Sequence, residues 1–340
     1  MKIQKWIVLV ITVALFMAIL VIPTLIVVPF TDSNAVSEVK ETPGGKKAKD
    51  EVTAQSPFSI RVLRTQTGQI ENVPLENYVA RVVASEMPVN FEIEALKAQA
   101  LAARTYITRH MIQEGSVSDH ADVTDTVKHQ VYKNEQELRE QWQDKYSTNI
   151  TKINQAVEET QGEIITYNHE PITAAFFSTS NGYTENAEDY WENEIPYLKS
   201  VESPWDQESP KFVDQKILTV EELQTSLGIR LTKDTTMTKT EGNRVERVNF
   251  GAQSFTGREI REKLDLPSSD FTIKQKGNHV IFTTRGYGHG VGMSQYGANG
   301  MAKIGKDYKE IVNHYYKDTK ISPISTLTAS IENNDKKQTN

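Results

Sequence analysis

The 340-residue sequence contains no cysteine. A disulfide framework of the kind found in small secreted domains is therefore excluded, and so is a metal site built on thiolates. Long runs of basic residues are also missing, and the net charge is −7. No nucleic acid is expected as a partner, because binding to a phosphate backbone depends on clustered Lys and Arg.

One long hydrophobic run is present near the N-terminus. It begins at Ile7, ends at Val28 and contains 22 residues without a charge. A helix rising about 1.5 Å per residue would make it roughly 33 Å long, enough to cross a hydrocarbon core of about 30 Å. A cleaved signal peptide is the alternative, but its apolar region is typically about 7–15 residues and ends at a small-x-small site, which is missing here. We therefore predict an uncleaved membrane anchor.

The charged residues on either side of this anchor differ, and they predict its orientation. Lys2 and Lys5 precede it and acidic residues follow it, so the positive-inside rule predicts a single-pass protein of the cell membrane with a cytoplasmic N-terminus and an extracytoplasmic body. Charge, Gly, Ser and Pro predict a flexible linker after it. The predicted parts are a stub and anchor at 1–30, the linker at 31–57, a folded body at 58–325 with a possible separate lobe at about 207–278, and a disordered tail at 326–340.

Hydrophobic periodicity predicts both strands and helices in the body. Alternation of apolar and polar residues indicates strands, and apolar spacings of three and four indicate helices. The expected fold class is therefore α+β, with helices and antiparallel sheets in one catalytic body and a second, smaller lobe. The predicted elements are hairpins over 58–75 and 163–177, a strand over 280–285, and helices over 76–84, 92–113, 148–162 and 307–316.

A single carboxylate stands in an apolar setting after the first predicted helix. Glu86 is flanked by Ala84, Met87 and Pro88. Partial removal from water would raise the pKa of its carboxyl, and a carboxyl tuned in this way can donate a proton to a leaving oxygen. By themselves, these residues fit a surface glutamate at a helix end better than a catalytic one.

Two further segments place polar side chains on backbones suited to turns. Residues 285–298 contain five glycines, which let a backbone approach a ligand closely. The segment is not a phosphate-binding loop, because it lacks the Gly-Lys-Ser/Thr sequence. Residues 176–186 place hydroxyls, an amide and Tyr183 after a strand, which suits hydrogen bonding to sugars but is also ordinary turn chemistry.

Three motifs in this order resemble the SpoIID/LytB family of endospore-forming bacteria. They are ASEMP followed by EALKAQALAARTY, then FFSTSNGYTENAEDYW, then RGYGHGVGMSQYGA. The resemblance covers about 58–320 and includes the anchor. It implies a peptidoglycan lytic transglycosylase that cleaves glycan strands stripped of stem peptides during engulfment of the forespore. It also implies a location between the mother-cell and forespore membranes, and action with stage II sporulation proteins P and M.

The same resemblance implies roles for individual residues. The family's catalytic glutamate falls on Glu86, and Ser178 is added as a substrate contact from the hydroxyl-rich turn. Lys97 and Arg104 share one face of the predicted helix over 92–113, which by spacing alone fits a solvated surface. The motif residues expected to contact substrate are Lys97, Arg104, Tyr106, Arg285, His289, Ser294, Gln295 and Tyr296.

No metal or other cofactor is expected. Some relatives hold zinc with His and Cys near the segment 124–132, but Lys128 and His129 stand where a His-Cys pair would be. His120 and His129 alone are too few ligands for a structural zinc site.

A lytic transglycosylase can use one carboxylate as both acid and base, whereas a glycoside hydrolase normally needs two, about 5–9.5 Å apart. A hydrolase could recruit Asp122, Asp125 or Glu185 as its second carboxylate. A non-catalytic glycan-binding module that enhances a partner amidase is the other alternative. Both stay open at the level of the sequence.

Overall fold

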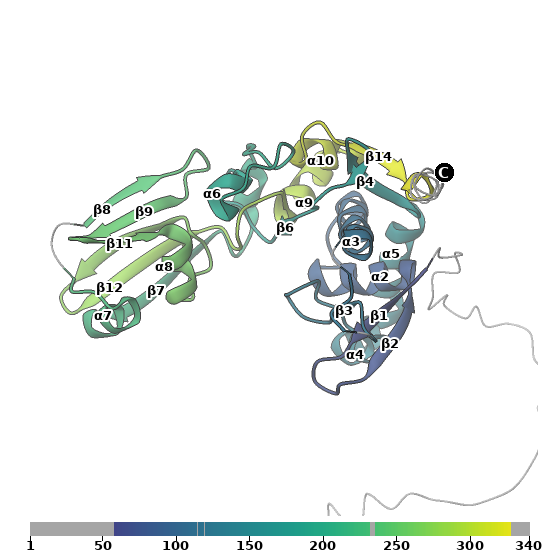
Figure 1. Cartoon of the computed structure of the whole chain (residues 1–340), viewed down its shortest axis with the longest axis horizontal. Helices are drawn as coiled ribbons and strands as arrows, with labels where there is room; N and C mark the ends of the chain where they lie inside the picture. The colour runs from purple at the N-terminus through teal and green to yellow at the C-terminus, as the bar shows by residue number, and fades with distance from the viewer. Residues whose placement is uncertain (1–57, 114, 119, 232–234, 328–340) are drawn as a thin grey trace, which may run out of the picture. The chain divides into compact units, whose positions relative to one another are not determined.

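The structure is a computed structural model that describes residues 58–113, 115–118, 120–231 and 235–327 (Figure 1). The predicted anchor and linker, and all but the first two residues of the predicted tail, lie outside the described residues. No helix within the described ranges is long and apolar enough to cross a membrane. The anchor and the domain boundaries therefore stay predictions.

The described chain mixes helices with several small sheets, which confirms the α+β class. Its order, with two 3-10 helices (η), is β1 (Ser59–Leu63), β2 (Ile70–Pro74), α2 (Leu75–Glu86), α3 (Ile93–Gln113), β3 (Val123–Thr124), α4 (Glu135–Trp142), η1 (Gln143–Lys145), α5 (Tyr146–Glu158), β4 (Glu163–Tyr167), β5 (Glu170–Pro171), β6 (Phe176–Phe177), α6 (Ala187–Trp191), η2 (Pro204–Glu208), β7 (Val213–Thr219), α7 (Val220–Leu227), β8 (Thr235–Lys239), β9 (Val245–Phe250), β10 (Gln253–Thr256), α8 (Gly257–Lys263), β11 (Phe271–Lys276), β12 (His279–Arg285), β13 (Met293–Ser294), α9 (Gln295–Lys303), α10 (Tyr308–Tyr315) and β14 (Lys320–Pro323).

The larger of the two hydrophobic clusters found in the described ranges surrounds α3. This helix is rich in alanine, which has the highest helix propensity and lets neighbouring backbones approach closely. It packs against α2, α5, α9 and α10 (Figure 1). Of its 21 residues, 13 are buried. The sequence predicted one apolar stripe, but a helix covered on most sides must also bury polar residues.

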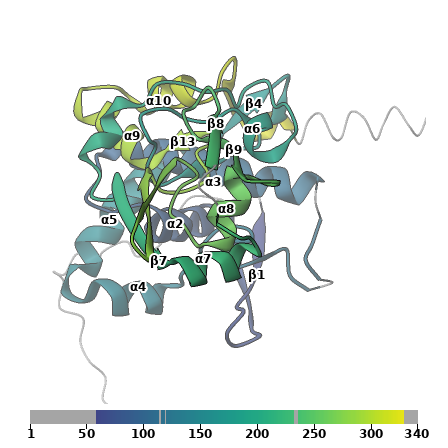
Figure 2. The ribbon, with the colours of Figure 1, turned by 90° about the vertical axis from the view of Figure 1, so that its left-hand side faces the viewer.

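A second hydrophobic cluster draws its buried residues from the segment between Leu223 and Phe282. It contains the antiparallel sheets β11-β12-β7 and β10-β9-β8, against which α7 and α8 pack (Figures 1 and 2). The cluster overlaps the lobe predicted at about 207–278. It also takes in β12, which the sequence analysis placed outside that lobe, because β12 lies between β7 and β11 in its sheet.

The predicted elements are largely present. β1 and β2 form the first hairpin, and the four predicted helices correspond to α2, α3, α5 and α10. The second hairpin is shorter than predicted, since β4 pairs with β5 and with β14. Its expected end, β6, pairs in parallel with β13 instead. That pairing joins the hydroxyl-rich turn to the glycine-rich loop.

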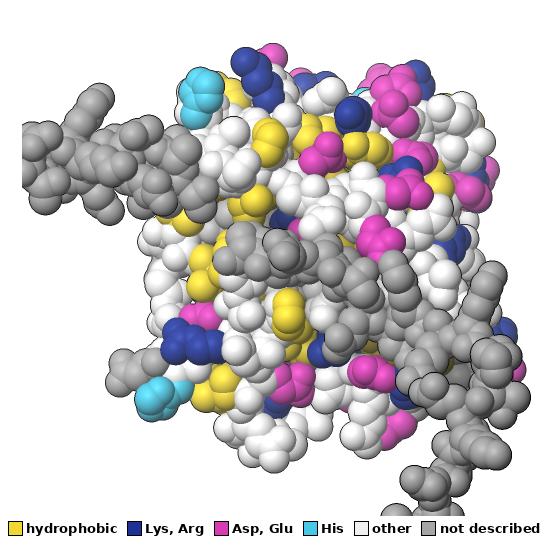
Figure 3. Space-filling model, turned by 90° about the vertical axis from the view of Figure 1, so that its right-hand side faces the viewer, with side chains coloured by type: hydrophobic (Ala, Val, Ile, Leu, Met, Phe, Trp, Pro, Cys, Tyr) yellow, Lys and Arg dark blue, Asp and Glu magenta, His cyan; other side chains and the backbone are white. Residues whose placement is uncertain are grey.

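Surface charge contributes little to this architecture. Acidic and basic side chains are interspersed over the coloured part of the face in Figure 3, with hydrophobic side chains between them. Exposed ion pairs such as Arg139–Glu135 on α4 are each worth about 0–1 kcal/mol. Stability therefore depends on the two hydrophobic clusters.

Candidate active site

A cavity of about 350 Å³ lies where the three sequence motifs meet. Its walls come from the end of α2, from β6 and the turn after it, from the glycine-rich loop, and from two cations outside the motifs. The lining residues are Glu86, Pro88, Phe176, Phe177, Ser178, Lys211, Arg261, Tyr287, Gly288, His289, Gln295 and Tyr296. Five of the residues predicted to contact substrate or perform catalysis are thus brought together: Glu86, Ser178, His289, Gln295 and Tyr296.

Glu86 is the last residue of α2. Pro88 follows two residues later and disfavours helical angles at Met87, so the chain turns there and the carboxyl is left at the helix end. The backbone N–H of Val131 donates a hydrogen bond of 2.9 Å to Glu86 Oε1. Burial raises the pKa of the Glu86 carboxyl, and the Val131 hydrogen bond opposes this in part. Among the described residues that line the cavity, Glu86 is the one carboxylate.

Gln295 connects the glycine-rich loop to this helix end. Its Nε2 donates to the backbone oxygen of Glu86 at 3.1 Å and to Gln99 Oε1 at 3.3 Å. Gln295 begins α9, whose N-cap hydroxyl, on Ser294, accepts from the Gly297 N–H. The end of α2 and the start of α9 are therefore held together at the cavity.

His289 is a neutral residue in this arrangement. Its Nδ1 accepts a hydrogen bond of 3.0 Å from the Val291 N–H, which leaves the ring proton on Nε2. Burial, and then the nearby Arg261 and Arg244 charges, lower the pKa of His289 to about 4. The imidazole is therefore uncharged at neutral pH and can act as a hydrogen-bonding or packing group but not as a cation.

The glycine-rich loop needs glycine where it crosses β6. Gly288 has a φ of +113°, and a Cβ there would lie 2.8 Å from Phe177 Cβ. No L side chain fits this backbone and this spacing without strain. Gly288 thus allows the loop to pack directly against Phe177, which lines the cavity.

Replacing Gly288 with Ala is expected to destabilise the protein by about 2–4 kcal/mol and to alter the cavity, because backbone strain and overpacking against Phe177 act together. Urea unfolding measures the first effect. Gly277→Ala is the control, since Gly277 (φ +59°) has no atom within 4 Å of an added Cβ and should cost only about 1 kcal/mol. Equal losses in the two variants would contradict this account of the loop.

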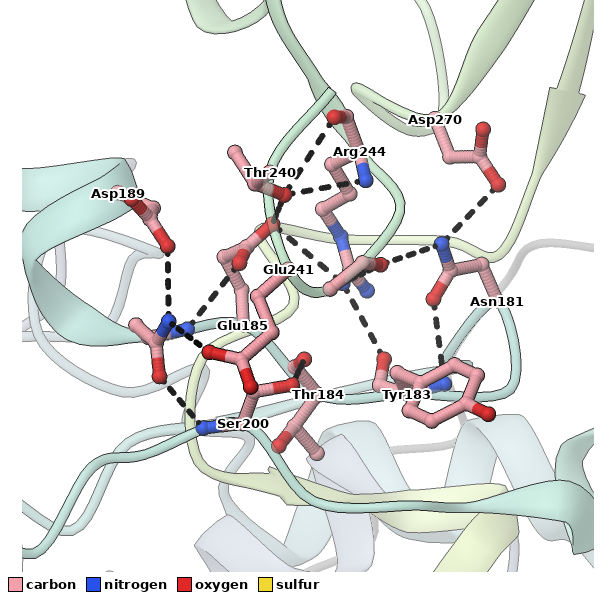
Figure 4. Close-up of polar contacts among 12 residues, drawn as sticks. Asn181, Tyr183, Thr184, Glu185, Asp189, Ser200, Thr240, Glu241, Arg244 and Asp270 are labelled. Atoms are coloured by element: carbon pink, nitrogen blue, oxygen red, sulfur yellow. Dashed lines mark hydrogen bonds and ion pairs between the residues drawn. The ribbon is translucent and has the colours of Figure 1, made fainter.

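A buried network supports the other side of the same loop (Figure 4). The Arg244 guanidinium lies against Gly290, where a Cβ would be 2.4 Å from Arg244 Cζ. Glu185 Oε2 is 3.8 Å from Arg244 Nη1 and accepts a hydrogen bond of 2.7 Å from Thr240 Oγ1. The Glu185 N–H donates to the Gly290 oxygen at 2.8 Å. Glu185 therefore holds the loop and does not line the cavity.

The other two carboxylates considered for a hydrolase are also engaged elsewhere. Asp122 forms an ion pair of 2.6 Å with Arg61, and Asp125 one of 3.2 Å with Arg64. Neither is among the described residues that line the cavity.

Five residues predicted to contact substrate lie outside the cavity lining, and two of them are fully buried. Arg104 is fully buried and pairs with Glu76 at 2.6 Å. Ser294 is also fully buried, and its hydroxyl donates to Asp206. Neither side chain can reach a glycan in this structure, because α3 and the start of α9 are covered by neighbouring elements.

The other three are more accessible. Lys97 forms ion pairs of 2.6 Å with both Glu94 and Glu159. The Tyr106 ring stacks on His110 at 6.2 Å. Arg285 is exposed at the end of β12. Their roles in substrate binding stay predictions.

Sequence reasoning missed both cations of the cavity. Lys211 precedes β7, and Arg261 lies on α8, in the region that was interpreted as a separate lobe. Neither stands in a motif, and an isolated Lys or Arg in a surface segment gives no signal of its own. Tyr287, in contrast, belongs to the glycine-rich motif and could have been included.

No metal-binding cluster of three or more His, Asp or Glu side chains is present among the described residues. The rings of His110 and His129 lie 5.2 Å apart, and His129 Nδ1 accepts from the Thr124 N–H at 3.2 Å. The expected absence of a cofactor stays a prediction.

Comparison with known proteins gives the same family as the motifs. A family model described as "Stage II sporulation protein" matches residues 63–167. The chain is 51% identical over 318 residues to "Stage II sporulation protein D" of Bacillus subtilis (strain 168), covering 89% of this chain and 92% of that protein. The identity is 48%, with the same coverage, for the protein of that name in Bacillus amyloliquefaciens.

A more distant relative has a different description. An "Amidase enhancer" of Bacillus subtilis (strain 168) is 29% identical over 299 residues, which cover 71% of this chain and 40% of that protein. The high identity to the first two relatives over most of both chains confirms the resemblance carried by the motifs, and the chain belongs to the stage II sporulation protein D family of sporulation proteins.

Proposed function

We propose that the chain is a lytic transglycosylase that cleaves stem-peptide-free glycan strands of peptidoglycan. The observation that carries this proposal is Glu86, one carboxylate with a raised pKa in a cavity with aromatic and hydrogen-bonding walls. A lytic transglycosylase needs only one such group. Family membership supports a role in sporulation.

The chemistry proceeds in two proton transfers at Glu86. The protonated carboxyl gives its proton to the glycosidic oxygen between muramic acid and glucosamine, and the C1–O bond breaks. The carboxylate then takes the proton of the muramic C6 hydroxyl as that oxygen bonds to C1, which closes the 1,6-anhydro ring. The raised pKa favours the first step, and the fixed cavity walls favour the second by holding O6 near C1.

The hydrolase alternative is less well supported. Asp122, Asp125 and Glu185 are each paired with an arginine and lie outside the cavity lining. The enhancer alternative draws on the relative described as an amidase enhancer. In that case the cavity would bind glycan without cutting it.

The setting of this activity belongs to the proposal as well. The predicted anchor at 7–28 would hold the enzyme at the cell membrane with its body extracytoplasmic, between the mother-cell and forespore membranes. Cutting would then be confined to wall within reach of about 27 linker residues. Stage II sporulation proteins P and M are the proposed partners, with P supplying stripped strands.

The full-length chain, purified in detergent and free of other wall enzymes, tests the proposal on stripped glycan. Mass analysis should show products that end in anhydromuramic acid, one water lighter than reducing ends. Binding without cleavage would establish the enhancer alternative, and reducing ends would establish a hydrolase.

A further inference from the structure

Two cations, Lys211 and Arg261, line the same cavity as Glu86. Lys211 Nζ lies 4.6 Å from the centroid of the Tyr287 ring. Arg261 donates from Nη1 to the Tyr190 hydroxyl at 2.9 Å and from Nε to the Pro267 oxygen at 3.3 Å. Neither has a carboxylate partner within 4.0 Å among the described residues, in contrast to Arg258 on the same helix, which pairs with Glu262 at 2.8 Å.

The cavity therefore carries an excess of positive charge. Lys211 and Arg261 contribute two charges, His289 is neutral, and Glu86 contributes at most one negative charge. When Glu86 holds the proton needed for catalysis, the excess is two. A ligand with an anionic group would balance this charge, and a cavity lined by a guanidinium and an ammonium is suited to a carboxylate.

The hydrogen bonds of Arg261 also fix the orientation of its guanidinium. Its Nε and Nη1 donate to groups of the protein that are neutral, so these bonds orient the guanidinium without cancelling its charge. Lys211 is exposed and held over an aromatic face. Both side chains are thereby presented to the cavity with their charge intact.

We infer that Lys211 and Arg261 bind the lactyl carboxylate that muramic acid exposes once its stem peptide has been removed. This inference rests on the proposed function, because it takes the ligand to be a glycan strand. In a strand that still carries peptides, the same carbonyl carbon is part of an amide, which is neutral and extended by the peptide. The two cations would thus select stripped strands over unstripped ones.

Binding measurements on the full-length chain carrying Glu86→Gln test the inference without turnover. Two soluble stripped strands of equal length are compared, one with free lactyl carboxylates and one with those groups converted to methylamides. The amide strand is expected to bind at least about tenfold more weakly, a difference of about 1.4 kcal/mol. Adding Lys211→Met and Arg261→Met should weaken binding of the carboxylate strand until the two strands bind alike.

Lys216→Met is the matched control, because Lys216 lies in the same region, pairs with Asp265 at 3.7 Å and does not line the cavity. It should keep the full discrimination. If Arg261→Met prevents folding, Lys211→Met alone should reduce the discrimination in part.

Equal binding of the two strands, binding of neither, or full discrimination in the cavity variants would each overturn the inference. Failure of the proposed function is a separate result, namely no cleavage of stripped strands by the unmodified chain.

Discussion

Glycan cleavage by the Glu86→Gln variant is expected to fall by at least about 10²–10⁴-fold, to the limit of detection, because the amide can neither donate nor accept the proton that the reaction transfers. The fold should persist, since a glutamine at this position can still accept the hydrogen bond from the Val131 N–H. Release of anhydromuramic ends from stripped strands measures the effect.

The same variant is expected to become more stable than the wild type as the pH rises. Because burial raises the pKa of Glu86 in the folded state, folding favours its protonated form, and the wild type loses stability as pH rises through that raised pKa. Below the pKa of the unfolded chain both states are protonated, so the two proteins should unfold alike there. Thermal unfolding from about pH 4 to pH 8 should show a growing advantage for the variant.

Glu135→Gln is the control for both measurements, because Glu135 lies in an exposed pair with Arg139 on α4. It should leave cleavage unchanged and alter stability by less than about 1 kcal/mol at any pH. Normal cleavage by Glu86→Gln, or a stability difference that does not depend on pH, would contradict the role given to Glu86.

The second large effect is expected at Arg104. Replacing it with Ala should reduce the free energy of unfolding by about 3–5 kcal/mol, because Glu76 would be left as a buried charge without its partner. The Arg104 guanidinium also donates to the backbone oxygens of Glu163 and Val157, at 3.1 Å and 3.4 Å, and these bonds would be lost as well. Urea unfolding measures the loss.

Two comparisons make this test specific. Arg139→Ala removes an exposed ion pair and a cation–π contact of 3.9 Å with Tyr146, and should cost only about 1 kcal/mol. Replacing Arg104 and Glu76 together with Met and Leu should restore much of the stability, since apolar residues of similar volume often substitute well for a buried pair. An Arg104→Ala variant of normal stability with weakened glycan binding would contradict this structural role and favour the substrate contact predicted from the motif.

These two residues show what the sequence could predict of the site. Glu86 stands two residues before a proline that ends its helix, so its place at a helix end follows from local chemistry. Arg104 stands in a helix whose covering by α2, α5, α9 and α10 depends on contacts between distant segments. A motif marks both residues as important, but only the packing distinguishes a group in the cavity from one in the core.

The elements of the fold also differ in whether the local sequence predicts them. Hydrophobic periodicity predicts α3 and the first hairpin because their patterns are local. The pairing of β6 with β13 joins two-residue strands more than a hundred residues apart, and no local pattern specifies it. Since that pairing brings the glycine-rich loop to Phe177, the cavity itself could not be derived from the sequence. Lys211 and Arg261 were missed for the same reason.

The central claim is that a single carboxylate, Glu86, cleaves the glycan without adding water. Cleavage of stripped strands in water enriched in heavy oxygen tests this most directly, since a hydrolase must place an oxygen from water on the new muramic end. The account predicts anhydromuramic ends that contain no heavy oxygen. New ends that carry one heavy oxygen for each bond broken would contradict it.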